Sequence, residues 1–232
     1  MPVVSKAHVK SVESFGNDVK KFTLGVEELE TFESGQFLQL TLDDFNGSGN
    51  WPESRPFTIA NYLDNQNEIE LIIKKTGAYT QRIFDELQAG KNCTIKYAYG
   101  DFLLPMFDQE AKIHAIAGGT GLAPFLSFAQ HLKAEFSTDN FLLYYTVSHA
   151  NEFVNLDLLR SILPKENLHL FCTRERVDYA LNKRIEINDV MQNVEQINDE
   201  YFYLCGSEAL ISNFNQLLTE KGADNIVFED WS

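Results

Sequence analysis

The sequence predicts two domains: an all-β domain over residues 1–106 and an α/β domain with a parallel sheet over residues 107–232. Two observations support this division. Strand-like segments follow one another closely in the first part, whereas apolar strands alternate with helical stretches in the second. The pattern changes near residues 105–111. A chain of 232 residues is long enough to bury a core in each of two small domains.

The first domain contains six segments rich in β-branched and aromatic residues, separated by turn residues, at 7–12, 19–26, 36–42, 56–61, 69–75 and 93–98. Close spacing favours antiparallel pairing, so we expect a barrel or a sandwich. One helical stretch over 79–90 interrupts the strands, with Ile83, Phe84 and Leu87 on one face and Gly90 at its end. Residues 43–54 form a long polar loop.

The second domain contains apolar strands at 113–117, 141–147, 168–173, 201–206 and 225–231. Helical stretches lie between them at 123–136, 153–163 and 207–222. Strands that are apolar throughout and alternate with helices are typical of a parallel sheet covered on both faces.

Three unusual features follow strands of this predicted sheet. They are the glycine cluster at 118–121, Thr173-Arg174 and Cys205-Gly206. Because ligands bind at the carboxyl ends of such strands, we expect the three features to share one edge. Each has a simpler interpretation as well: glycines also make tight turns, and a cysteine such as Cys205 is often a small core residue.

The glycine cluster matches neither common phosphate-binding fingerprint. "GGTG" is not G-x-G-x-x-G, no acidic residue is expected after the second strand to hold a ribose, and Gly-Lys-Ser/Thr is missing. A standard dinucleotide-binding fold and a P-loop are therefore not supported. A phosphate cradle of another kind and a plain turn both remain open.

The composition argues against several classes of protein. A net charge of −15, with both halves acidic, argues against a nucleic-acid partner. Three cysteines support neither a disulfide framework nor an iron–sulfur cluster, and we expect no metal. No apolar run approaches the roughly 20 residues of a membrane span. The N-terminus lacks the apolar core of a signal peptide, so we expect a cytoplasmic protein without a membrane span.

"RPFTIAN" at 55–61, followed in order by "GGTGLAP", "LCGS" and "FEDWS", resembles the ferredoxin–NADP reductase superfamily from about Val3 to Ser232. The resemblance implies an N-terminal Greek-key antiparallel barrel that binds FAD, over 1–106. It also implies a C-terminal α/β domain that binds NADPH or NADH, over 107–232. The implied protein is a flavin-dependent oxidoreductase that passes hydride from the nicotinamide dinucleotide to FAD.

The resemblance also implies roles for residues of the first domain. Arg55 pairs with a flavin phosphate through its guanidinium, Phe57 packs against the isoalloxazine, and Thr58 offers its hydroxyl to the nitrogen that accepts hydride. Strand alternation places Arg55 and Phe57 on one side and Thr58 on the other. The implied FAD-binding set comprises Arg55, Pro56, Phe57, Thr58, Ile73, Lys74, Gly77, Thr80 and Trp231, with Gly77 and Thr80 cradling the pyrophosphate at a helix start. "YGDFLLP" matches the family's next motif without its proline and one glycine.

In the second domain, the resemblance implies that the glycine cluster cradles the pyrophosphate of the nicotinamide dinucleotide. Cys205 lies near the carbon that gives up hydride, and Glu229 supplies an acidic group. Trp231 stacks on the flavin and swings aside for nicotinamide. The implied catalytic residues are Thr58, Cys205, Glu229 and Trp231. The implied nucleotide-binding residues are Gly118, Gly119, Thr120, Gly121, Thr173, Arg174, Arg184, Cys205 and Gly206.

Two questions stay open at this level. Arg174 and Arg184 favour NADPH as readers of a 2′-phosphate, although Arg-Glu-Arg is also typical of a solvated surface. The separate electron acceptor is an iron–sulfur protein, a flavodoxin, an oxygenase component, free flavin or a ferric chelate. An acidic protein acceptor needs basic residues at the cleft rim, and the candidates are Lys20, Lys21, Lys74, Lys75, Arg82 and Lys96.

Two other functions are compatible with the same residues. The chain is alternatively an FAD-binding electron-transfer subunit or sensor of a larger complex that does not turn over alone. A third interpretation is a binding module without redox chemistry, which requires the cleft motifs to be coincidence.

Overall fold

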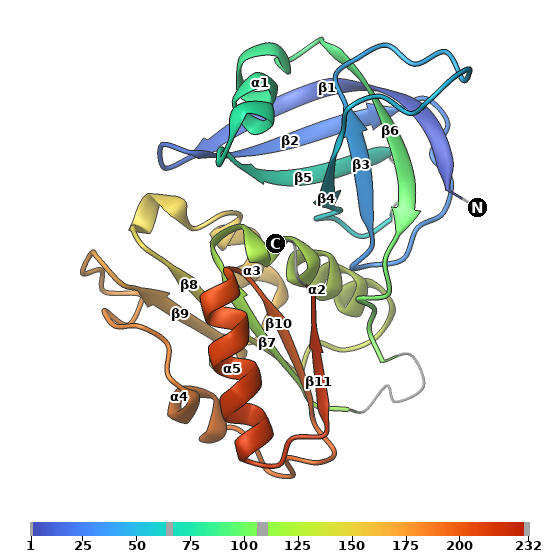
Figure 1. Cartoon of the computed structure of the whole chain (residues 1–232). Helices are drawn as coiled ribbons and strands as arrows, with labels where there is room; N and C mark the ends of the chain where they lie inside the picture. Colours follow the sequence, from blue (N-terminus) through green and yellow to red (C-terminus); the bar gives the residue numbers. More distant parts are fainter. Residues whose placement is uncertain (1, 64–66, 106–110, 230–232) are drawn as a thin grey trace.

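The computed structural model describes residues 2–63, 67–105 and 111–229, arranged as two domains side by side (Figure 1). The predicted boundary between residues 106 and 107 lies outside the described residues. In the described part of the chain, no helix combines the length and apolar character needed to cross a membrane.

The first domain is an antiparallel, nearly closed barrel of six strands in the order β4-β3-β6-β1-β2-β5. This non-sequential order, with β6 between β3 and β1, is that of the expected Greek-key barrel. A single bridge between Ile59 and Leu71 links its two edge strands. The strands are β1 (Val3–Phe15), β2 (Val19–Val26), β3 (Phe37–Thr41), β4 (Arg55–Thr58), β5 (Glu68–Lys74) and β6 (Asn92–Tyr99).

The barrel core consists of the apolar side chains that alternate along these strands. Helix α1 (Ala78–Glu86) closes one side of the core, where Tyr79, Ile83 and Phe84 are buried. Leu87, just after the helix, is buried with them. The predicted apolar face at 83, 84 and 87 is therefore the face that packs on the barrel.

The second domain is a five-stranded parallel sheet in the order β11-β10-β7-β8-β9. Its elements are β7 (Ile113–Gly118), η1 (Gly119–Leu122), α2 (Ala123–Glu135), β8 (Phe141–Val147), η2 (Ala150–Glu152), α3 (Leu156–Ile162), η3 (Lys165–Asn167), β9 (Leu168–Cys172), α4 (Ile187–Met191), β10 (Tyr201–Cys205), α5 (Glu208–Glu220) and β11 (Asn225–Phe228).

Helices cover both faces of this sheet, as its continuously apolar strands predict. Helices α2 and α3 contribute to the core on one face, and α4 and α5 contribute to the core on the other. The short helix α4 was not expected from the sequence, because only Val190 of its five residues is buried.

A buried polar network lies on the α4–α5 side of the sheet, away from the barrel. His114 Nε2 lies 2.5 Å from Glu200 Oε2, while Glu200 Oε1 accepts hydrogen bonds from the backbone N–H groups of Glu195 and Gln196. Burial lowers the pKa of His114, so a neutral imidazole donates to the carboxylate. With its polar groups satisfied inside one domain, this network is structural.

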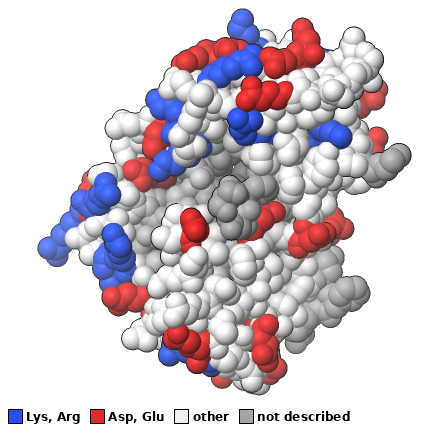
Figure 2. All heavy atoms as spheres, in the orientation of Figure 1, with Lys and Arg blue, Asp and Glu red and all other residues white. Residues whose placement is uncertain are grey.

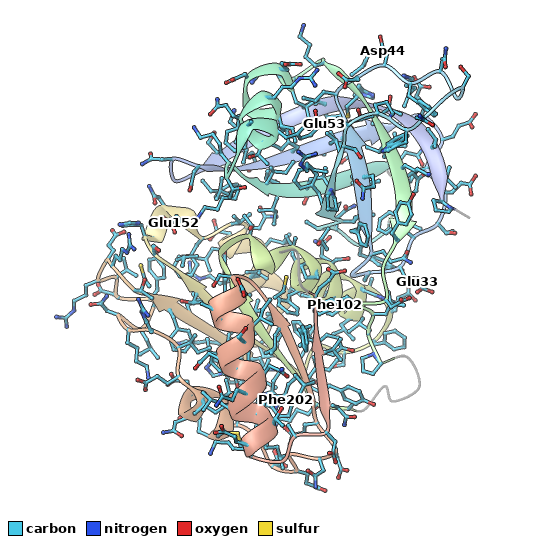
Figure 3. The ribbon with its side chains drawn as sticks, in the orientation of Figure 1. Glu33, Asp44, Glu53, Phe102, Glu152 and Phe202 are labelled. Carbon is cyan, nitrogen blue, oxygen red and sulfur yellow. The ribbon has the colours of Figure 1, made fainter. Side chains whose placement is uncertain are left out.

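The two domains are joined by aromatic packing as well as by the chain. Phe102, which follows β6, inserts into the core of the second domain beside α2 (Figure 3). Its ring centroid lies 5.9 Å from that of Phe125, 5.8 Å from that of Phe128 and 5.2 Å from that of Tyr203. Phe102 is 3% exposed, so this cluster fixes the end of the barrel against the α/β domain.

We predict that Phe102→Ala lowers the free energy of unfolding by about 3–5 kcal/mol, because it leaves a cavity inside the aromatic cluster. Phe102→Leu keeps most of the volume and should cost less than about 1.5 kcal/mol. Urea denaturation of the three proteins measures both values. Equal midpoints for wild type and Phe102→Ala would show that the cluster does not hold the domains together.

Candidate functional site

A cleft of about 660 Å³ lies between the two domains, and Figure 2 shows a hollow between the upper and lower lobes. This volume falls in the range of about 300–1,000 Å³ that is typical of small-molecule sites. The barrel contributes Pro56, Phe57, Thr58, Ile72, Lys74, Thr76 and Thr80 to its lining. The second domain contributes Gly118, Gly119, Thr120, Gly121, Ala123, Thr146, Val147, Ser148, Glu152, Thr173, Cys205, Gly206, Ser207 and Leu210.

The barrel wall of the cleft is made by its two edge strands. One edge of β4 pairs with β3, and beyond the Ile59–Leu71 bridge the other edge has no partner strand in the described part of the chain. Such an edge presents unpaired N–H and C=O groups, apart from Pro56, which has no N–H. Consecutive residues 56, 57 and 58 therefore all border the cleft, although the sequence placed Phe57 and Thr58 on opposite sides of the strand.

Strand alternation explains where the residues of β5 point. Ile73 is fully buried in the barrel core, whereas its neighbours Ile72 and Lys74 line the cleft. Ile72 thus takes the place that the sequence suggested for Ile73. Lys74 lies within 3.4 Å of Asp18 and is the one Lys or Arg among the described residues of the cleft lining.

Helix α1 begins beside this wall with an open first turn. Thr80 Oγ1 accepts hydrogen bonds from the N–H groups of Thr76 and Gly77, at 2.9 and 3.0 Å. No atom lies within 4 Å of a Cβ built on Gly77, and no acidic residue occupies the first turn. The remaining first-turn N–H groups and the positive end of the helix dipole suit an anion such as a phosphate.

Arg55 does not line the cleft but lies at its barrel margin. Its guanidinium stacks over the ring of Tyr79 at 4.7 Å. It also donates to the carbonyl of Ser54 and the carboxylate of Glu53. The side chain is exposed, so the Glu53 contact is a weak surface pair that another anion can replace.

The glycine cluster forms the opposite wall. Strand β7 ends at Gly118, and η1 leads directly into α2 with Pro124 in the first turn. A Cβ on Gly121 would lie 2.2 Å from the carbonyl oxygen of Cys205, so only glycine lets the loops after β7 and β10 touch. Gly119 has φ +56° and open space beside it. The cluster thus forms a tight turn at Gly121 and leaves open space beside Gly119.

The arginines proposed for a 2′-phosphate lie outside the cleft lining. Thr173 lines the cleft, whereas Arg174 and Arg184 are exposed on the segment after β9. Neither arginine forms an ion pair with a described residue. Figure 2 shows basic side chains gathered at the left edge of the second domain. The guanidinium groups of Arg174 and Arg184 are thus free of ion pairs with the described carboxylates.

Cys205 and Glu229 lie near each other at the end of the sheet, and Cys205 alone of the two is among the cleft-lining residues. Burial raises the pKa of Cys205 to about 12, with a further contribution from the Glu229 carboxylate, so the thiol is neutral and unreactive. Burial raises the pKa of Glu229 to about 7, and its Oε2 is buried without a hydrogen-bond partner among the described residues. Trp231 lies outside the described residues.

Glu152 is a cleft residue that the sequence did not reveal (Figure 3). It follows β8, where no acidic residue was expected, and its carboxylate accepts hydrogen bonds from the Ser148 N–H and His149 Nδ1, each at 3.0 Å. Although burial raises its pKa, these hydrogen bonds lower it more, so the group is ionised. The sequence motifs did not identify Glu152, because it lies five residues after the end of the strand, in η2, and not directly at the strand end.

Three of the six basic residues proposed for the rim are paired with carboxylates. Lys21 is buried between Glu13 and Glu70, and Arg82 pairs with Asp43 and Glu86. Contacts also engage the others: Lys20 with the Phe84 carbonyl and ring, Lys75 with the Phe84 ring, Lys96 with the Trp51 ring and Lys74 with Asp18. Lys20, Lys75 and Lys96 therefore keep charges that no described carboxylate pairs, whereas Lys21, Lys74 and Arg82 are paired.

Two family models match the chain, one for each domain. The oxidoreductase FAD-binding domain matches residues 6–103, and the oxidoreductase NAD-binding domain matches residues 115–216. Together they account for both walls of the cleft.

Curated relatives are similar over most of the chain. The reductase subunit of an aromatic O-demethylase from an Amycolatopsis species is 32% identical over 212 residues, covering 88% of this chain and 62% of that protein. A flavodoxin/ferredoxin–NADP reductase from Buchnera aphidicola is 25% identical over 203 residues, covering 80% and 79%. The chain thus spans less than two thirds of the length of the demethylase subunit.

Solved structures share the fold. The cytochrome P450 reductase GcoB of Amycolatopsis superimposes with a TM-score of 0.84 at 25% identity, covering 99% of this chain and 70% of that one. A ferredoxin NADP+ reductase from Neisseria gonorrhoeae with bound FAD and NADP superimposes with a TM-score of 0.79 at 20% identity, covering 97% and 98%. With both domain families matched in order, this chain belongs to the ferredoxin–NADP reductase superfamily.

Proposed function

We propose that the protein is an NAD(P)H-dependent flavoprotein reductase. The observation that carries the proposal is the cleft itself, which sets the edge of β4 against the glycine cluster after β7. One wall offers an apolar strand edge beside a helix N-terminus, and the other offers a glycine cradle. A flavin on the first wall and a nicotinamide on the second would face each other.

The barrel residues fit FAD. Phe57 and Ile72 supply apolar surface for the ring system, and Thr58 supplies a hydroxyl beside it. Arg55 and the first turn of α1 at Gly77 would hold the phosphates. FAD, when bound there, accepts a hydride and can pass electrons on one at a time. The protein supplies orientation and a cleft that excludes water.

The second domain would hold the nicotinamide dinucleotide. Gly119 and its neighbours receive the pyrophosphate, and the close packing at Gly121 brings Cys205 to the nicotinamide end. The neutral Cys205 thiol acts through shape rather than as a nucleophile. Glu229, with a pKa of about 7, is poised to hold or release a proton beside the transfer site at neutral pH.

NADPH is the nucleotide that we favour. Arg174 follows the cleft residue Thr173, Arg184 is exposed further along the same segment, and neither has an ion-pair partner among the described residues. Guanidinium groups suit a phosphate monoester. The ionised carboxylate of Glu152 lines the same wall of the cleft and would repel a phosphate group bound next to it. A 2′-phosphate would therefore lie outward, on the arginine side.

The acceptor in this proposal is a separate oxygenase or ferredoxin component. Relatives include the reductase component of a naphthalene 1,2-dioxygenase system from Pseudomonas putida. Because the net charge is −15 and three of the six rim cations are paired with carboxylates, long-range attraction contributes little to docking an acidic partner. We therefore expect such a partner to dock through contacts at short range.

The reductase proposal is tested by anaerobic mixing of FAD-loaded protein with NADPH or NADH. We expect rapid bleaching of the flavin band, faster with NADPH. Arg174→Ala should raise the concentration of NADPH needed for half-maximal rate by about tenfold and leave that of NADH unchanged. Bound FAD that neither nucleotide bleaches would contradict the proposal and favour a subunit that needs a larger complex.

Gly121→Ala tests the nucleotide cradle, because the added Cβ must push the loop after β7 away from Cys205. We predict at least a roughly tenfold loss of NADP+ affinity by calorimetry, with FAD retention unchanged. Gly222→Ala, which strains a positive φ at the end of α5 far from the cleft, is the control for a general loss of stability. Wild-type NADP+ affinity in Gly121→Ala would exclude this cradle.

Glu229 should give the reaction a pH dependence. Its raised pKa means that the carboxyl is protonated below about pH 7 and can then donate a hydrogen bond into the site. We predict that the bleaching rate falls as pH rises through 7, and that Glu229→Gln, which always donates, abolishes this inflection. A profile that keeps the inflection in Glu229→Gln would assign it to another group.

A further inference from the structure

Helix α2 connects the two walls of the cleft through polar contacts behind it. Its N-terminal end continues the glycine cluster, and its later turns contact the segment that follows β4. Ser127 Oγ donates to the carbonyl oxygen of Asn61 at 2.9 Å. The hydroxyl of Tyr62 donates to Glu135 at 2.7 Å, and its ring stacks on His131 with centroids 4.8 Å apart.

The hydrogen bond between Ser127 and Asn61 is buried and belongs to a network that also includes β5. Ser127 is 0% exposed and Asn61 is 7% exposed. Asn61 is also tied to β5, because its Oδ1 accepts from the Glu70 N–H at 2.7 Å and its Nδ2 donates to the Glu68 carbonyl at 3.0 Å. One residue thus links the ends of β4 and β5 to α2.

We propose that Ser127 and Tyr62 are positioning residues for hydride transfer, an inference that rests on the proposed reductase function. We call the barrel side of the cleft the flavin wall and the second-domain side the nucleotide wall. Asn61 lies three residues after Thr58 of the flavin wall, and Ser127 lies six residues after Gly121 of the nucleotide wall. The hydrogen bonds between these segments therefore set the spacing of the two walls. Neither Ser127 nor Tyr62 lines the cleft, so they act through the backbone that they hold.

The step that they position is sensitive to distance. A C–H bond of the reduced nicotinamide breaks and an N–H bond forms on the flavin. The electron pair travels with the hydrogen, so the nucleotide is oxidised and the flavin is reduced by two electrons. Displacing the reacting atoms by about 1 Å costs up to about 100-fold in rate. A displacement of the two walls leaves the residues of each wall in place, so the affinities for FAD and for the nicotinamide dinucleotide should change little.

A purely structural role would predict a different pattern. Thr138 offers a matched comparison, since its hydroxyl is also buried and donates to the Ile162 carbonyl at 3.2 Å, but within the second domain alone. Removing either hydroxyl leaves one buried carbonyl without a donor. Only the loss at Ser127 weakens the contact between the walls.

The experiment compares Ser127→Ala, Tyr62→Phe and Thr138→Val with wild type. Tyr62→Phe keeps the ring on His131 and removes the hydroxyl. We expect the bleaching rate at saturating NADPH to fall about tenfold in Ser127→Ala and less in Tyr62→Phe, with unchanged dissociation constants for FAD and NADP+. Thr138→Val should lose similar thermal stability and keep the wild-type rate. In protein without nucleotide, amide hydrogen exchange at 59–62 should rise in Ser127→Ala and not in Thr138→Val.

The outcomes separate this inference from the function on which it rests. Normal bleaching and normal exchange at 59–62 in Ser127→Ala would overturn the positioning role and leave the reductase intact. Equal slowing in Thr138→Val would also overturn it. Wild-type protein that NADPH and NADH fail to bleach would remove the proposed function, and this inference with it.

Discussion

Helix α2 packs against the sheet of its own domain and contacts the barrel at the same time, and the geometry of the cleft depends on both contacts. Its N-terminal end extends the glycine loop that lines the cleft, and its buried face fills the core of the α/β domain. The same helix holds the end of β4 through Ser127 and packs against Phe102 through Phe125 and Phe128. A shift of α2 would therefore move the nucleotide wall relative to the flavin wall.

The charge distribution shows how an acidic protein can bind anionic cofactors. The net charge of −15 opposes them at long range, and Lys74 is the one Lys or Arg among the described residues that line the cleft. Binding must then come from short-range features. The N-termini of α1 and η1 have no acidic residue in their first turns, so their backbone N–H groups are available to an anion. The guanidinium of Arg55 can donate hydrogen bonds to a phosphate. Backbone dipoles thus take the role that a basic patch plays in other phosphate-binding proteins.

Local sequence patterns predicted much of the fold, because most strands and helices here obey simple periodicities. The order of apolar strands and helices predicted the parallel sheet, and the glycines at and after the end of β7 marked the edge of the sheet that faces the cleft. Contacts between distant segments were not readable in this way. The choice of Ile72 over Ile73 depends on barrel register, Glu152 reaches the cleft through a loop, and the pairing of Ser127 with Asn61 joins segments 66 residues apart.

In the proposed reaction, the cleft would bring a flavin and a nicotinamide into direct contact. The most direct measurement is single-turnover bleaching of FAD-loaded protein with NADPH deuterated at one or the other hydrogen of the transferring carbon. A rigid cleft presents one face of the nicotinamide, so one labelled form should react more slowly and the other at the unlabelled rate. Equal rates for all three forms would contradict direct, face-selective hydride transfer in this cleft.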